Sequence, residues 1–216
     1  MIRFTTRLDG MARLAAAALT AAVLTPAHAE PLAQTDGSWQ VTAAAPGAGW
    51  NSSAAFNTAS WQAATVLYNV ADYPGYSGYT AQAIWSSGGQ FSNTETTIWA
   101  RQVWNLAALP SSATMVAGFD DDADLWINGI QVVSDHNGIA NNVGPVDLLP
   151  YLSLGNNLIA FTASDNYPTY GYNHAAWVQI DGQRGGTVPE PATPALMLAG
   201  LAATALAVRR RKKKAR

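Results

Sequence analysis

The stretch GFDDDADLWINGIQVV, residues 118–133, carries the clearest structural signal in the chain. Asn128-Gly129 stands between two short apolar runs, residues 125–127 and 130–133. Asn and Gly adopt positive φ readily, and both central positions of a type I′ turn require it. The stretch therefore predicts a tight antiparallel hairpin, and with it a protein built from β-sheet.

Short strands are predicted along the rest of residues 30–181 as well. Eight Trp, eight Tyr and many β-branched residues favour strands, and no segment keeps an apolar period of 3.6 residues over several turns. The expected strands are residues 38–42, 97–104, 113–119, 158–163 and 175–180, with a turn at Gly155-Asn156-Asn157. About 150 residues bury one core without a disulfide, and the chain has no cysteine. We expect an all-β fold with a single β-sandwich domain over residues 30–181.

Read in order, this region resembles the galactose-binding-like β-sandwich, or jelly roll. The matching pieces are Trp39 and residues 59–63, 98–104, 118–129, 146–152 and 154–160. Such domains accompany rhamnosidases and sialate esterases as accessory modules, so the resemblance implies a binding domain rather than a catalytic one. Residues 68–89, rich in Tyr, Gly and Ser, have no counterpart in the pattern.

The N-terminus has the organisation of a secretory signal peptide. Three arginines, the last of them Arg13, accompany an apolar run at residues 14–24, and Ala27-His28-Ala29 offers small residues at the positions that signal peptidase reads. We expect residues 1–29 to be removed after Ala29. Because Asp9 is unusual in a basic leader, Met11 is an alternative start to Met1.

The C-terminus combines three elements in a fixed order. Val188-Pro189-Glu190-Pro191 follows a Gly-rich linker at 182–187, an apolar run at 192–208 is expected to form a transmembrane helix, and a basic tail at 209–216 is expected to stay cytoplasmic. Residues 188–216 resemble a PEP-CTERM sorting signal. The resemblance implies processing by an exosortase of a Gram-negative bacterium, with an inner-membrane-inserted precursor and a mature protein at the cell surface or in the extracellular matrix. A permanent membrane anchor is the alternative.

The charge distribution excludes one class of partner. From residue 30 to 187 there are 12 acidic residues against Arg101 and Arg184, a net charge of about −10. Nucleic acid binding needs a basic surface to neutralise phosphates, so no nucleic acid partner is expected.

The acidic run offers a candidate metal site. Asp120, Asp122 and Asp124 have the spacing that opens an EF-hand loop, and Ca²⁺ prefers oxygen ligands of this kind. The pattern then fails, because Leu125 replaces the required glycine and Gln131 the bidentate glutamate. A structural Ca²⁺ on these three carboxylates is one interpretation, and a solvated strand entrance is the other.

Aromatic side chains on two polar loops form a candidate carbohydrate site. Flat rings with polar tips suit the apolar faces of sugars, while nearby amides meet the hydroxyls. The candidate residues are Tyr73, Tyr76, Tyr79, Tyr167, Tyr170, Tyr172, Asn173 and His174. The alternative is that these tyrosines pack on their own loops. Six tryptophans in strand patterns are expected in the core: Trp39, Trp61, Trp99, Trp104, Trp126 and Trp177.

The residue inventory does not favour catalysis. There is no cysteine, His136 and His174 are the only histidines after the leader, and neither belongs to a catalytic motif. We expect an exported, non-catalytic surface protein that binds extracellular polysaccharide. A structural or adhesive matrix protein without sugar binding is the alternative, and a glycan-active hydrolase is a third hypothesis.

Overall fold

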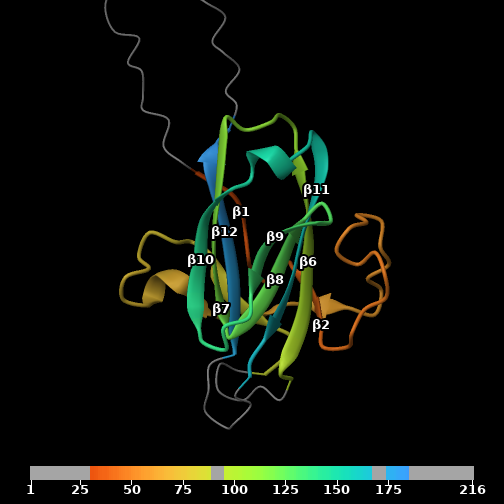
Figure 1. Cartoon of the computed structure of the whole chain (residues 1–216), viewed down its shortest axis with the longest axis vertical. Coiled ribbons are helices and arrows are strands. Elements are labelled where there is room, and N and C mark those ends of the chain that lie inside the picture. Colours follow the sequence, from red (N-terminus) through yellow and green to blue (C-terminus); the bar gives the residue numbers. More distant parts are fainter. Residues whose placement is uncertain (1–29, 89–94, 167–173, 185–216) are drawn as a thin grey trace, which may run out of the picture.

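The computed structural model describes residues 30–88, 95–166 and 174–184. These residues form two antiparallel sheets of six strands that face one another (Figure 1). The predicted all-β sandwich is therefore confirmed. The leader, the sorting signal and its expected helix lie outside the described residues, and no described helix is long and apolar enough to cross a membrane.

The first sheet has the strand order β10-β7-β12-β5-β4, and β1 also pairs with β12. Its strands are β1 (Glu30–Gln34), β4 (Thr65–Asn69), β5 (Gln82–Trp85), β7 (Ser112–Asp120), β10 (Asn141–Asp147) and β12 (Ala175–Gln183). The second sheet has the order β3-β2-β6-β11-β8-β9. Its strands are β2 (Gln40–Thr42), β3 (Gln62–Ala63), β6 (Thr97–Leu106), β8 (Asp122–Ile127), β9 (Ile130–Asp135) and β11 (Gly155–Ser164). Two short 3-10 helices, η1 (Val70–Asp72) and η2 (Leu149–Tyr151), complete the described elements.

The core lies between the sheets and follows the two-residue alternation of the strands. Trp39 is 1% exposed and its ring centroid lies 5.4 Å from that of Phe161, which in turn lies 5.6 Å from Phe119. Met115 and Ile180 fill the same layer from β7 and β12. Because alternate residues of each strand point inward, the residues between them are left for the two outer faces.

The Asn128-Gly129 hairpin forms as predicted. The φ angles are 51° at Asn128 and 84° at Gly129, the positive values that a type I′ turn needs. Asn128 also fastens the turn to β11: its Oδ1 accepts a hydrogen bond from the Leu158 amide at 2.8 Å, and its Nδ2 donates to the Tyr151 carbonyl at 2.9 Å. The hairpin is thus held by its own side chain as well as by backbone conformation.

Two predicted boundaries differ from the structure. The turn expected at residues 155–157 is part of β11, because Gly155 already pairs with Leu106 and the buried Asn157 satisfies the neighbouring backbone, donating to the Ser153 carbonyl at 2.7 Å. Strand β12 runs to Gln183, so Gly182 lies in the sheet opposite Ala113 and not in a linker.

The tryptophans also depart from the sequence interpretation. Trp39 and Trp177 are buried, and Trp104 is half-buried and packs against the core, whereas Trp61, Trp99 and Trp126 are half-buried and are not part of the core cluster. Several of these face outward, where residues 43–61 cover the second sheet and bring Trp50 within 5.4 Å of Trp126. Residues 70–81 cover the first sheet in the same way, and the two covering segments, orange and yellow in Figure 1, lie on opposite sides of the sandwich.

Candidate functional site

Trp177 is the centre of an aromatic cluster on the outer face of the first sheet. It alternates with Ala176 and Val178, which point into the core, so its indole lies outside the sheet and crosses β7 at Gly118. A Cβ at Gly118 would lie 2.2 Å from Trp177 Nε1, so only glycine leaves room for this indole. Residues 70–81, the covering segment of the first sheet, add Tyr79 and Tyr76, whose ring centroids lie 5.0 Å and 6.1 Å from that of Trp177.

Gln179 attaches the covering segment to the sheet. It is 2% exposed, and its Oε1 accepts hydrogen bonds from the amides of Thr80 at 2.6 Å and Ala81 at 3.0 Å. Its Nε2 donates to both carboxylate oxygens of Asp181 at 3.0 Å. A buried amide with all these partners holds the tyrosine-bearing segment in one position.

A cavity of about 210 Å³ opens beside this cluster. Its lining comes from β4, η1, the covering segment, β7, β10 and β12: Tyr68, Val70, Tyr73, Tyr76, Gly118, Phe119, Asp120, Ala140, Asn141, Asn142, Ala175 and Trp177. The rings of Tyr68 and Tyr73 lie 4.6 Å apart, and Asn142 Nδ2 donates to the Tyr76 hydroxyl at 2.7 Å. The cavity therefore presents aromatic rings together with amide, hydroxyl and carboxyl groups.

Asp120 has an unusual electrostatic environment in this cavity. Burial raises its pKa to about 7, and the neighbouring carboxylates of Asp121 and Asp165 act in the same direction. The pKa of Tyr68 is raised to about 12, first by burial and then by Tyr73, Asp120 and Tyr76. A carboxyl group that titrates near neutral pH marks a candidate functional site.

The structure brings together only part of the predicted tyrosine set. Tyr73 and Tyr76 line the cavity, whereas Tyr79 packs on Trp177 without lining it. His174 is buried elsewhere: its Nε2 lies 3.2 Å from Asp165 Oδ2, and its ring lies 5.4 Å from that of Trp85. The predicted residues outside the described part of the chain are Tyr167, Tyr170, Tyr172 and Asn173.

Sequence reasoning missed most of the residues that line this cavity. Tyr68 lies in a strand, Trp177 has the pattern of a core residue, and Asn142 stands in a stretch without a distinctive motif. Asp120 was interpreted as a metal ligand or as part of a solvated strand entrance. Gly118 within an apolar strand, which pairs with Trp177, is a signal that could have indicated a bulky ring over this strand.

The three carboxylates of the predicted calcium site lie on different faces of the sandwich. Asp120 ends β7 on the outer face of the first sheet, next to the core residue Phe119. The chain then crosses to the second sheet, where Asp122 and Asp124 alternate with core residues of β8 and point to the opposite outer face. No group of three His, Cys, Asp or Glu side chains suited to a metal occurs within residues 30–88, 95–166 and 174–184. The three-carboxylate ligand set is thus not formed.

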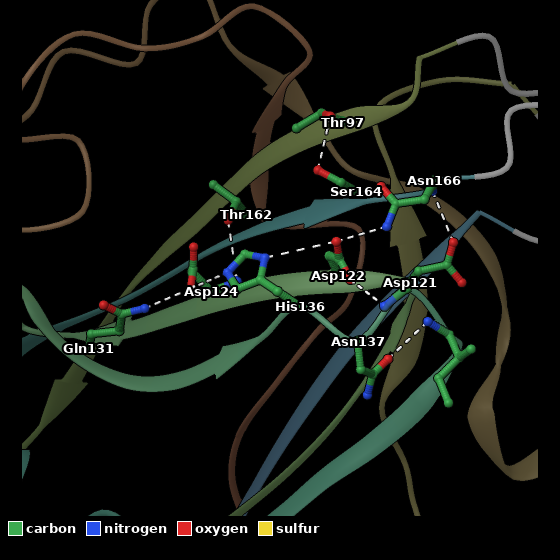
Figure 2. A network of polar contacts seen from close by, with 12 residues as sticks. Thr97, Asp121, Asp122, Asp124, Gln131, His136, Asn137, Thr162, Ser164 and Asn166 are labelled. Carbon is green, nitrogen blue, oxygen red and sulfur yellow. Dashed lines mark hydrogen bonds and ion pairs between the residues drawn. The ribbon is translucent and has the colours of Figure 1, made fainter.

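Asp122 and Asp124 instead take part in a local polar network with His136 (Figure 2). Asp122 accepts hydrogen bonds at 2.8 Å from the Gly138 amide and from the Asn166 side chain. The Asn166 bond is the main reason that the pKa of Asp122 is lowered. Asp124 accepts from Gln131 Nε2 at 2.6 Å, and His136 Nε2 lies 3.1 Å from the same oxygen. These contacts fit the alternative interpretation, in which the acids secure the entrance to a strand.

The C-terminal segment matches a known sorting sequence. The PEP-CTERM protein-sorting motif aligns with residues 187–212, which include Val188-Pro189-Glu190-Pro191, the apolar run and the first basic residues. This chain carries a PEP-CTERM sorting motif. The PEP-CTERM motif marks an exported, exosortase-processed protein of a Gram-negative bacterium, anchored at the membrane before processing.

Solved structures similar to this chain include several glycosidases. A glycosyl hydrolase family 2 member from Bacteroides cellulosilyticus is 18% identical, with a TM-score of 0.42, over 68% of this chain and 20% of that one. A β-glycosidase from Bacteroides vulgatus has 18% identity and a TM-score of 0.43 over the same shares. The α-L-rhamnosidase of Streptomyces avermitilis, complexed with L-rhamnose, has 22% identity and a TM-score of 0.37 over 45% of this chain and 10% of that one. The chain thus spans about a fifth or less of these proteins. None of the curated proteins matches it in sequence.

Proposed function

We propose that the exported domain is a non-catalytic module that binds extracellular polysaccharide in the cavity on the outer face of the first sheet. The observation that carries the proposal is the combination of Tyr68, Tyr73, Tyr76 and Trp177 with Asp120 and Asn142 around one cavity of about 210 Å³. Sugars present apolar C–H faces to aromatic rings and hydroxyl groups to carboxyl and amide groups, so this lining is complementary to a saccharide.

The position of the cavity supports binding to a polymer. It lies on a sheet face beside a covering segment that Gln179 holds in place, so the rings need little reorganisation to receive a ligand. Its small volume suits one or two sugar units of a longer chain. We expect weak binding at a single domain, strengthened where many copies meet one polymer.

The carboxyl groups around the cavity support a binding role over hydrolysis. A glycosidase uses two carboxyl groups that flank the scissile bond at a separation of roughly 5 to 10 Å. Among the residues that the structure describes, Asp120 is the one carboxyl group in the lining of this cavity, and no described histidine joins it there. The lining therefore offers a polar contact but no acid–base pair.

The test compares polysaccharide retention by four forms of the exported chain, purified from the envelope in mild detergent. We expect the wild type to be retained on exopolysaccharide of the producing cells, and Tyr73→Ala or Tyr76→Ala to reduce retention about tenfold, because each removes one ring of the lining. Trp61→Ala, which removes a half-buried ring near Trp50 on the opposite face, is the matched control and should bind like the wild type.

Two outcomes would contradict the proposal. Absence of retention of the wild type on any glycan would favour a structural matrix protein, and turnover of a glycan would favour a hydrolase. Calcium and EDTA are added in parallel: because the described carboxylates form no ligand set, we expect EDTA to leave retention unchanged.

A further inference from the structure

Among the described residues, Asp120 is the one carboxyl group in the lining of the cavity, and no arginine, lysine or histidine lies in that lining. Both arginines of the described region are remote. Arg101 belongs to the second sheet, where its guanidinium donates to the carbonyls of Trp50 at 2.7 Å and Ser53 at 2.8 Å. Arg184 follows β12, nine residues or about 30 Å of strand beyond Ala175 in the cavity wall. No described cation therefore neutralises Asp120 from within the cavity.

The rings beside Asp120 favour a positive charge as well. The faces of Tyr68, Tyr73, Tyr76 and Trp177 carry the negative part of the aromatic quadrupole, which attracts cations within about 6 Å of a ring centroid. Tyr68 and Tyr73 are 4.6 Å apart, so one group beside this pair contacts both. Aromatic faces next to a carboxylate form a cage for an ammonium group.

An unpaired acceptor lies in the same lining. Asn141 Oδ1 is buried and has no hydrogen-bond partner among the described residues. A buried acceptor without a donor costs about 1 to 3 kcal/mol, and an ammonium group supplies donors without adding acceptors. Asp120 and Asn141 together could receive two of the three N–H groups of a primary amine.

We propose that the cavity selects amino sugars, with the protonated amine held by Asp120, Asn141 and the surrounding aromatic rings. This inference rests on the proposed carbohydrate function and narrows it to a class of glycan. Acidic sugars are disfavoured because their carboxylates would meet Asp120 without any basic partner. An N-acetylated sugar loses the charge and gains no compensating contact.

The charged neighbours of Asp120 make a cation favourable there. Tyr68 faces it from β4, Tyr73 and Tyr76 from residues 70–81, and Asp121 and Asp165 from the ends of β7 and β11. His174 Nε2 lies 3.2 Å from Asp165 Oδ2. Burial, followed by the carboxylates of Asp121 and Asp165, raises the pKa of Asp120 to about 7. A bound ammonium group would stabilise the ionised carboxylate, so ionisation of Asp120 should raise the affinity for a protonated amine.

The polar lining favours a sugar over other ammonium ligands. Asn142 and the Tyr76 hydroxyl form a hydrogen-bonded pair at 2.7 Å that can exchange bonds with sugar hydroxyls. A trimethylammonium group has no N–H to donate to Asp120 or Asn141, and a lysine side chain has no hydroxyl for Asn142.

The test measures affinities of the exported chain for glucosamine oligomers, their N-acetylated forms and glucuronic acid oligomers at pH 7. We expect glucosamine oligomers to bind about tenfold more tightly than the N-acetylated forms, and glucuronic acid oligomers not to bind. Asp120→Asn, nearly the same in shape, should abolish the tenfold preference by weakening the binding of the glucosamine oligomers. Asp124→Asn removes the same charge on the opposite face and should keep the preference, which excludes an effect of net charge.

The outcomes separate this inference from the proposed function. Equal binding of charged and N-acetylated oligomers, or a preference that survives in Asp120→Asn, overturns the amino-sugar inference while carbohydrate binding stands. Tighter binding of phosphocholine or of a lysine-rich peptide also overturns it. Absence of binding to every glycan by the wild type would instead contradict the proposed function itself.

Discussion

Gly118→Ala tests whether the aromatic cluster depends on close approach of Trp177 to β7. The added Cβ would lie 2.2 Å from Trp177 Nε1, 2.6 Å from Trp177 Cε2 and 2.8 Å from Asn142 Oδ1. Normal carbon contacts are about 3.5 Å, so the indole must move outward by about 1 Å. The backbone of β7 lies on one side of the indole and Tyr79 lies on the other, at a centroid distance of 5.0 Å, so this movement disturbs the ring contact with Tyr79.

The magnitude follows from two terms. Overpacking by one methyl group costs about 1 to 3 kcal/mol, and loosening the pairs of Trp177 with Tyr76 and Tyr79 adds about 1 kcal/mol. We therefore expect Gly118→Ala to lower the free energy of unfolding by about 2 to 4 kcal/mol and to reduce polysaccharide retention, because Trp177 forms the cavity wall.

Urea-induced unfolding followed by tryptophan fluorescence measures the first effect, and retention on exopolysaccharide the second. Gly78→Ala is the matched control, since a Cβ there meets nothing within 4 Å and the change should stay within about 0.5 kcal/mol. If Gly118→Ala is as stable as Gly78→Ala and binds normally, the crossing of Trp177 over β7 has no energetic role and the reasoning is refuted.

Three further predictions concern the carboxylate, the covering segment and the sorting motif. Asp120 has a folded-state pKa of about 7 against an ordinary 3.8, so the folded protein holds its proton longer and wild-type stability falls as pH rises from about 4 to about 7. Asp120→Asn removes this pH-dependent loss of stability, so the increase in its urea midpoint over that of the wild type should be larger at pH 8 than at pH 5. An equal increase at both pH values would contradict the raised pKa of Asp120. Gln179→Ala leaves the amides of Thr80 and Ala81 without an acceptor, and should speed their hydrogen exchange at least tenfold while β11 amides stay protected. Glu190→Ala in the sorting motif should accumulate full-length precursor in the membrane on immunoblots, and normal processing would show that the glutamate is not read.

Local signals in the sequence predicted several features correctly. Asn128-Gly129 has both positive φ angles of the predicted turn because only these two residues decide its conformation. The predicted strands at 97–104, 113–119 and 175–180 lie within β6, β7 and β12, since alternation of apolar residues reflects burial of one strand face. The sorting motif was predicted because it is a linear sequence that a processing enzyme reads.

The candidate site was predicted only in part because it is assembled across elements distant in sequence. Tyr73 and Tyr76 were predicted because they lie on a polar loop. Trp177 was interpreted as a core residue, because the alternation of side chains along a strand does not show which segment covers its outer face. Asn142 reaches Tyr76 over 66 residues, a contact that no local pattern indicates.

The acidic run shows the same division most clearly. The sequence places four carboxylates between residues 120 and 124, at the end of one strand and the start of the next. The spacing of Asp120, Asp122 and Asp124 alone suggested that they share one cation. The tertiary structure sends the chain from one sheet to the other between Asp120 and Asp122, so alternation within each strand turns these side chains to opposite outer faces. Sequence by itself therefore determined several strands, the hairpin and the C-terminal sorting motif. Only the packing of the two sheets decided which side chains share a cavity, because that depends on contacts between residues far apart in the chain.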